Sequence, residues 1–197
     1  MMKLYYAPGF SSLAGHIALL EAGLAHELVR VDIVTKQTET GGSFLEVNPK
    51  GYVPALLFED GELLTENVAI LAWIADRAPA LAPAGTLGRS ALIEMLSFIA
   101  TEIHKRFPLY LTLPEAAQPM LREQIAQWIG HVAGRLTGDY LFGNAFSAAD
   151  AYLFVMVRGA SELGFTLPAP LPEYVARIEA RPSVREALRR ETRMQLP

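Results

Sequence analysis

Cysteine is absent from this 197-residue sequence, which excludes disulfide bonds, thiolate metal sites, iron–sulfur clusters and cysteine nucleophiles. The formal net charge is −4 and no stretch is strongly basic, so we expect neither nucleic acid nor an acidic membrane as a partner. No apolar run approaches the ~20 residues of a membrane span, and no charged start leads into one, so we predict no membrane helix and no signal peptide. Four scattered histidines do not have metal-ligand spacing, so we expect no metal. Together these absences predict a cytoplasmic protein.

The first part of the chain alternates between strands and helices. Apolar residues at spacings of two and of three to four residues distinguish the strands from the helices. A β-hairpin turns at Asp60-Gly61, and the next helix opens at Thr65. The expected elements are a strand at 3–6, a helix at 13–24, a strand at 27–33, a short turn at 43–47, a hairpin at 53–64 and a helix at 65–78. This βαβ-ββα order predicts an α/β domain over residues 1–78.

The rest of the chain has the pattern of helices. A linker rich in Pro, Ala and Gly at 79–88 precedes a predicted all-helical domain over 89–197. Ser147 and Asp150 have the spacing of a capping box, with Phe146 as the hydrophobic staple, and open a helix that two more helices follow. Two apolar stripes predict the earlier helices: Leu92, Leu96, Ile99 and Ile103, and then Leu121, Ile125, Trp128, Val132 and Leu136. The fold class is therefore α/β plus all-α.

This order of elements and motifs resembles the cytosolic glutathione transferases, in particular their bacterial beta class. Six segments carry the resemblance across essentially the whole chain: KLYYAPGFSSLAGHIALLEAGL, VDIVTKQTETG, FLEVNPKGYVPAL, LLTENVAI, FIATEIHK and FSAADAYLF. It implies a thioredoxin-like first domain, a helical-bundle second domain, a homodimer, and glutathione as co-substrate. The chain departs from the beta class at the catalytic position, because Ser11 stands where that class carries its active-site cysteine.

A serine at a helix N-terminus has a narrower chemistry than a cysteine. It cannot form a mixed disulfide, and its hydroxyl stays neutral at pH 7 unless a strong base lies beside it. It can donate a hydrogen bond to the glutathione thiolate, and a bond to a charged group contributes about 1.5–3 kcal/mol. We rank Ser11 first as this donor, then Ser12, which is alternatively a helix cap, and then Tyr6, which is alternatively an ordinary core aromatic.

Thr65-Glu66-Asn67 opens a helix directly after a strand, and the free N–H groups of a helix start favour a carboxylate. We expect the Glu66 carboxylate to take the ammonium of glutathione and Asn67 to hold its γ-glutamyl carboxylate. The alternative is that acidic residues simply favour the first turn of a helix. The family often has Ser or Gly where Asn67 stands.

The resemblance implies four further contacts with glutathione. A cis Val53-Pro54 bond exposes the Val53 backbone to the cysteinyl residue, and Lys36 binds the glycine carboxylate. His104 lies near the thiol, and Glu102 reaches the ligand of the partner subunit. Without the resemblance, Lys36 reads as solvated surface, His104 as a surface or core residue, and Pro54 as a proline tolerated at a strand start.

The second substrate is expected between the two domains, in an apolar pocket lined by Phe10, Phe107 and Tyr110, although aromatic residues at helical spacing are also typical of a core. The predicted function is a glutathione transferase that conjugates the glutathione thiolate to an electrophilic, largely apolar molecule. The alternative is a catalytically weak protein of the same fold that binds glutathione or a hydrophobic molecule. A thiol–disulfide exchanger or a glutathione lyase of the usual kind is excluded because each requires cysteine.

Overall fold

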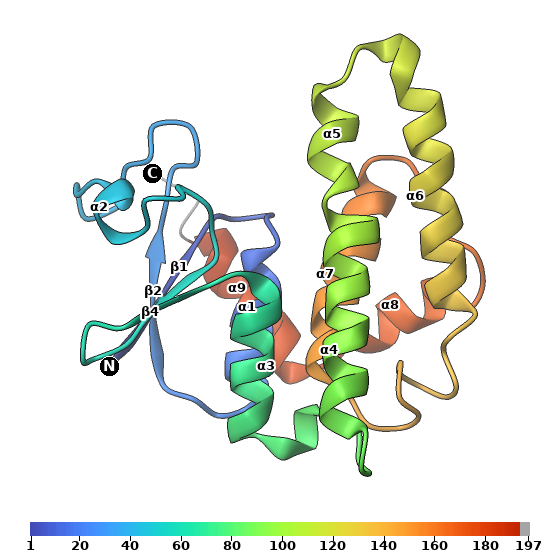
Figure 1. Cartoon of the computed structure of the whole chain (residues 1–197), viewed down its shortest axis with the longest axis horizontal. Helices are drawn as coiled ribbons and strands as arrows, with labels where there is room; N and C mark the ends of the chain where they lie inside the picture. The colour runs from blue at the N-terminus through green and yellow to red at the C-terminus, as the bar shows by residue number, and fades with distance from the viewer. Residues whose placement is uncertain (194–197) are drawn as a thin grey trace.

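The computed structural model describes residues 1–193, so the last four residues of the helical domain predicted over 89–197 lie outside the described residues. Figure 1 shows a small sheet on one side of the molecule and a group of long helices on the other. The helices α1 (Ser12–Glu21) and α3 (Asn67–Arg77) lie between them, and both contact α7 (Ala148–Glu162). No helix within residues 1–193 is long and apolar enough to cross a membrane.

The sheet has four strands in the order β2-β1-β3-β4. Its strands are β1 (Met2–Tyr6), β2 (His26–Arg30), β3 (Ala55–Leu57) and β4 (Leu63–Thr65). Because α1 connects β1 to β2, these two strands run parallel, whereas β3 is antiparallel to both of its neighbours, β1 and β4. The predicted βαβ-ββα order is therefore confirmed, and the arrangement is thioredoxin-like.

The two faces of the sheet are covered differently. Leu4 and Leu56 are opposite each other in the register of β1 and β3 and belong to the core that α1 and α3 share with the helical part. The next residue along β1, Tyr5, points to the other face, since successive side chains of a strand alternate. Its ring lies 5.4 Å from the ring of Phe44, which opens α2 (Phe44–Val47). Along the register, Tyr5 pairs with Ala55 and Ala55 with Thr65, so β1 and β4 lead into α1 and α3 from the same end of the sheet.

The helical part is built around α7, which is buried along most of its length. The predicted capping box is confirmed, because the Ser147 N–H donates to Asp150 at 2.8 Å and the Asp150 N–H donates to the Ser147 hydroxyl. The elements around it are η1 (Pro79–Leu81), α4 (Gly88–Phe98), the π-helical η2 (Ile99–His104), α5 (Arg106–Thr112), η3 (Glu115–Ala117), α6 (Gln118–Ala133), α8 (Leu171–Glu179) and α9 (Pro182–Arg193).

Two predicted boundaries in the first part were wrong. Thr65 is the last residue of β4, and α3 begins at Asn67 with Glu66 as its N-cap. The chain turns from strand to helix at Glu66, whose φ of 73° belongs to neither element. The strand predicted over 27–33 ends at Arg30, because the carboxylate of Asp32 accepts the N–H groups of Val34 and Thr35 and closes a turn.

The second apolar stripe was wrong in two of its members. Ile129 is buried in α6 in place of Trp128, whose ring packs at the edge of the core against Phe98. Leu136 lies beyond the last residue of α6, Ala133. Apolar spacing locates a helix well but resolves poorly which of two adjacent large residues faces the core.

Candidate functional site

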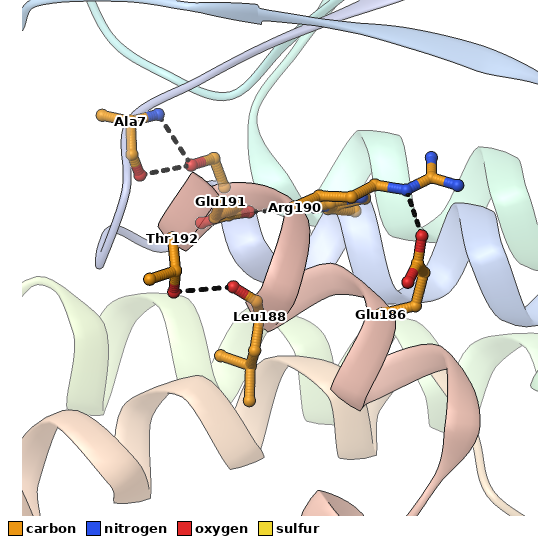
Figure 2. A network of polar contacts seen from close by, with 8 residues as sticks. Ala7, Glu186, Leu188, Arg190, Glu191 and Thr192 are labelled. Carbon is orange, nitrogen blue, oxygen red and sulfur yellow. Dashed lines mark hydrogen bonds and ion pairs between the residues drawn. The ribbon is translucent and has the colours of Figure 1, made fainter. Parts of the chain in front are cut away.

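The end of β1 and the loop from Ala7 to Ser12, which joins β1 to α1, hold the three hydroxyl groups considered for the thiolate. Ser12 is fully buried, and its hydroxyl accepts the Ala7 N–H and donates to the Ala7 carbonyl, each at 3.2 Å. Figure 2 shows these two bonds at Ala7. The Ser12 hydroxyl thus uses its proton and one lone pair for hydrogen bonds within the loop itself.

Ser11 occupies the N-cap position of α1, but its side chain makes no capping hydrogen bond. No hydrogen-bond partner for its hydroxyl exists among residues 1–193. Tyr6 is fully buried, and burial, followed by the nearby Glu191 carboxyl, raises its pKa to about 12. Of the three candidates, Ser11 is the one whose hydroxyl is uncommitted at the mouth of a helix.

The loop is held from below by α9. The Glu191 carboxyl lies 3.0 Å from Nδ1 of His16 and beside the Gly9 N–H, which lowers its pKa, and both side chains are buried. Burial raises the pKa of Glu191 to about 8, partly offset by Arg158, and burial lowers the pKa of His16 to about 4. Figure 2 shows Glu191 on α9 together with Glu186 and Arg190 of the same helix. Sequence reasoning missed Glu191, which has no local motif and lies 175 positions from His16.

The start of α3 carries the two residues expected to hold the γ-glutamyl end of glutathione. The exposed Glu66 carboxylate lies 2.8 Å from Nζ of Lys50, which also donates to the Thr65 hydroxyl at 3.0 Å. Asn67 is buried, and its Oδ1 has no hydrogen-bond partner. Sequence reasoning missed Lys50, although it stands in the same NPKG segment that leads to Val53-Pro54.

The segment before β3 brings three more of the predicted residues together. The Val53-Pro54 peptide bond is cis, which the resemblance implied. Nζ of Lys36 donates to the Gly51 carbonyl at 2.9 Å and lies 6.0 Å from the centroid of the Tyr52 ring. Lys36, Val53 and Pro54 are therefore neighbours at the end of the sheet, next to the loop that Lys50 anchors to Glu66.

His104 links the helical part to this region. Its Nδ1 lies 2.7 Å from the hydroxyl of Tyr152, a buried residue of α7, and burial lowers the pKa of His104. Burial raises the pKa of this tyrosine, and the nearby Asn67 side chain partly offsets that rise. The structure thus connects His104 to the start of α3 through a tyrosine that sequence reasoning did not single out. Glu102 is ion-paired with Arg106 at 2.9 Å on its own helix.

The three aromatic residues expected around the second substrate do not share one environment. Phe10 is exposed on the loop before α1, whereas Phe107 is buried with its ring 6.1 Å from that of Phe165. Tyr110 is half-buried, and its hydroxyl accepts a hydrogen bond from Arg122 at 3.0 Å.

Two cavities flank these elements. One of about 170 Å³ lies beside the loop, where Gly9 and Glu191 contribute to its wall. A larger cavity of about 920 Å³ lies between α3, the linker and α4, and none of the predicted site residues line it. No group of three side chains able to hold a metal ion occurs within residues 1–193.

Comparison with known proteins places this geometry in a family. A family model described as the N-terminal domain of glutathione S-transferases matches residues 12–77. Glutathione S-transferase GstA of Escherichia coli O157:H7 is 42% identical, over 96% of this chain and 98% of its own. A sphingomonad glutathione S-transferase solved in complex with glutathione is 44% identical, with a TM-score of 0.88 over 96% of this chain and 98% of its own. A beta-class enzyme of Sphingomonas chungbukensis is 45% identical, with a TM-score of 0.89 and the same coverage. The chain therefore belongs to the glutathione S-transferase family.

Proposed function

We propose that this protein conjugates the thiolate of glutathione to an electrophilic, largely apolar small molecule. The observation that carries the proposal is the uncommitted hydroxyl of Ser11 at the N-terminus of α1. The glutathione S-transferase names and the bound glutathione of its relatives support the same activity. The family and the uncommitted hydroxyl together favour catalysis over simple storage of a ligand, and we propose the cytoplasm as the location.

Ser11 would act by stabilising the sulfur of the ligand as a thiolate. A hydroxyl donating to a charged acceptor contributes about 1.5–3 kcal/mol, which corresponds to a thiol pKa lowered by roughly one to two units. The positive end of α1 adds to this stabilisation. The alternatives are weaker, because the Ser12 hydroxyl is bonded to Ala7 on both sides and Tyr6 is fully buried.

The other contacts that we propose for glutathione come from segments at the end of the sheet and from the helical part. Glu66, released from Lys50, would take the ammonium, and Asn67 with the start of α3 would hold the γ-glutamyl carboxylate. The Val53 backbone would pair with the cysteinyl residue, and Lys36 would bind the glycine carboxylate. Glu102 would contact the ligand of the partner subunit in a homodimer.

The second substrate would enter between a domain of residues 1–78 and a helical domain beginning at 89, joined by the linker 79–88. Phe10 is the exposed aromatic residue at this entrance and would contact an apolar electrophile. Phe107 and Tyr110 would support that surface from within the helical domain, through their contacts with Phe165 and Arg122.

The test is the variant Ser11→Ala, with the ultraviolet absorbance of bound glutathione thiolate followed as a function of pH. We expect the thiol pKa to rise by about one to two units and kcat/KM at neutral pH to fall roughly 10- to 100-fold, with glutathione affinity by calorimetry little changed. An unchanged thiol pKa and turnover would refute the role of Ser11.

A second candidate function is supported by the same substitution of serine for the family's cysteine. A protein that binds glutathione without activating it would give tight binding by calorimetry and no turnover across a broad panel of electrophiles. That outcome in the wild-type protein would replace the transferase by a binding protein.

A further inference from the structure

The charged groups of glutathione outnumber the charged side chains that face them in the contacts proposed above. At neutral pH glutathione carries two carboxylates and one ammonium. Lys36 would bind the glycine carboxylate and Glu66 the ammonium, whereas the γ-glutamyl carboxylate would meet only Asn67 and the N–H groups at the start of α3. Lys50 lies beside Glu66 and supplies the missing cation at this place.

The turn that carries Lys50 is held by Asn48, whose side chain is buried. The Gly51 N–H donates to the Asn48 carbonyl at 2.9 Å and closes the turn. The Asn48 side chain accepts the Lys50 N–H at 3.2 Å and donates to the Tyr52 carbonyl at 2.8 Å. The backbone of Lys50 is therefore fixed, while its exposed side chain reaches across to the end of β4 and the start of α3.

The ammonium of Lys50 keeps one proton for a further acceptor. A lysine ammonium has three N–H donors. One donates to the Thr65 hydroxyl at 3.0 Å and one to Oε1 of Glu66 at 2.8 Å. Within residues 1–193, neither the third N–H of Lys50 nor Oε2 of Glu66 has a partner. The ion pair thus presents a free donor and a free acceptor side by side.

A ligand can exchange this ion pair readily. The Lys50 side chain is 53% exposed and the Glu66 side chain 67%, and water screens such a pair so that it adds little to stability. The next residue, Asn67, is buried at the first position of the eleven-residue helix α3, and its Oδ1 has no hydrogen-bond partner. An exchangeable ion pair beside an unsatisfied polar atom indicates a site for a ligand that brings a cation and an anion together.

We propose that Lys50 binds the γ-glutamyl carboxylate of glutathione, leaving Glu66 as Glu66 takes the ammonium. The inference rests on the proposed function, because it takes glutathione as the ligand. One carbon atom of the γ-glutamyl residue carries both groups, so they meet Lys50 and Glu66 as a pair of opposite order. One exposed ion pair is broken and two are formed. The site thereby selects a ligand with a free α-amino acid end.

The test measures by calorimetry how much affinity is lost when the ligand lacks this carboxylate. The two ligands are S-methylglutathione and the same compound with a 4-aminobutanoyl group in place of the γ-glutamyl group, so that the thiol takes no part. The loss of affinity between them is compared in the wild type and in Lys50→Met. We expect the loss to be roughly threefold to tenfold greater in the wild type, the size of one charge-assisted contact at an exposed site.

Two further variants control for charge and for exposure. Lys50→Arg keeps the cation and should keep most of the wild-type effect. Arg135→Met removes another exposed cation from an ion pair with an exposed carboxylate, that of Glu94, and should leave the effect at its wild-type size. An equally reduced effect in Arg135→Met would show that the net charge of the protein is responsible, which overturns the inference.

The same loss of affinity in the wild type and in Lys50→Met would also overturn it. If Lys50→Met binds both ligands more tightly by one common factor, Lys50 only competes with the ammonium for Glu66, and the contact with the carboxylate is refuted. The expected difference without turnover of any electrophile would refute the transferase function and leave the role of Lys50 intact. Turnover together with equal losses would refute the role of Lys50 alone.

Discussion

Replacing the buried Glu191 by glutamine should remove a specific part of the pH dependence of stability. The Glu191 carboxyl contacts His16 and the Gly9 N–H, and its pKa is raised from 4.5 to about 8 by burial. Between these two values the folded protein binds more protons than the unfolded chain, so stability is full at low pH and is lost as the pH rises to 8. His16, whose pKa is lowered from 6.5 to about 4, acts in the opposite direction below pH 6.5.

From pH 6.5 to 8 the comparison of the wild type with Glu191→Gln isolates Glu191, because both proteins carry the same histidines. His16, His26 and His104 have lowered pKa values, so they are neutral in the folded state while the unfolded chain still loses their protons in the lower part of this window, and this raises stability in both proteins alike. At about 1.4 kcal/mol per pH unit below its pKa, Glu191 by itself should lower the free energy of unfolding by about 1.5 kcal/mol across the window. Glutamine mimics the protonated acid, since its amide can donate to His16 and its carbonyl can accept from Gly9.

The assay is urea unfolding at a fixed protein concentration, at closely spaced pH values from 6.5 to 8. From pH 6.5 to 8 the free energy of unfolding of the wild type should fall by about 1.5 kcal/mol relative to that of Glu191→Gln. The control is Glu186→Gln on the same helix, because Arg189 and Arg190 lower the pKa of Glu186 to about 2 and keep it charged throughout. The same pH dependence of stability in the wild type and in Glu191→Gln across this window would refute the reasoning.

Three further predictions concern the loop and the capping box. Ser12→Ala should lower the free energy of unfolding in urea by about 1–3 kcal/mol, because the Ala7 N–H loses its hydrogen-bond partner. It should leave the pKa of the bound glutathione thiol unchanged, and a raised thiol pKa would contradict our ranking of the serines. Ser11→Cys should form a mixed disulfide when oxidised glutathione is added, with release of one reduced glutathione, whereas Ser12→Cys should not. Mass spectrometry detects the added glutathione, and its attachment to Ser12→Cys alone would show that Ser12, and not Ser11, faces the ligand sulfur. Asp150→Ala leaves four buried donors without their acceptor and should destabilise by about 3–5 kcal/mol, against about 1 kcal/mol for Ser147→Ala. Equal losses in urea unfolding would show that the buried network adds nothing to the cap.

The features that sequence reasoning predicted correctly are those that depend on near neighbours. The hairpin turn at Asp60-Gly61 is present, with Gly61 at a φ of 89°, and the capping box at Ser147 and Asp150 is formed. Each depends on residues within a few positions, where spacing and residue type restrict the geometry. The predicted start of α3 and the predicted burial of Trp128 in place of Ile129 were wrong because the local pattern is compatible with both alternatives. Tertiary packing determines which of them forms.

The candidate site divides in the same way. The sequence by itself determined that the chemistry at the mouth of α1 is that of a hydroxyl, because no cysteine exists anywhere in the chain. It did not decide among Ser11, Ser12 and Tyr6, since three hydroxyls in seven residues differ only in what surrounds them. The tertiary structure separated them by tying Ser12 to Ala7, burying Tyr6 and leaving Ser11 without a partner.

The residues that pair with the site residues could not be predicted from local sequence pattern either. Glu191 meets His16 across 175 positions, and Tyr152 meets His104 across 48. Such pairs depend on how α7 and α9 pack against α1 and η2, where a small rotation of one helix would separate them. Residue types and spacing thus determined which chemistry is possible here, and packing alone decided which atoms are buried, paired and free to act, because burial and hydrogen-bond competition exist only once distant segments have come together.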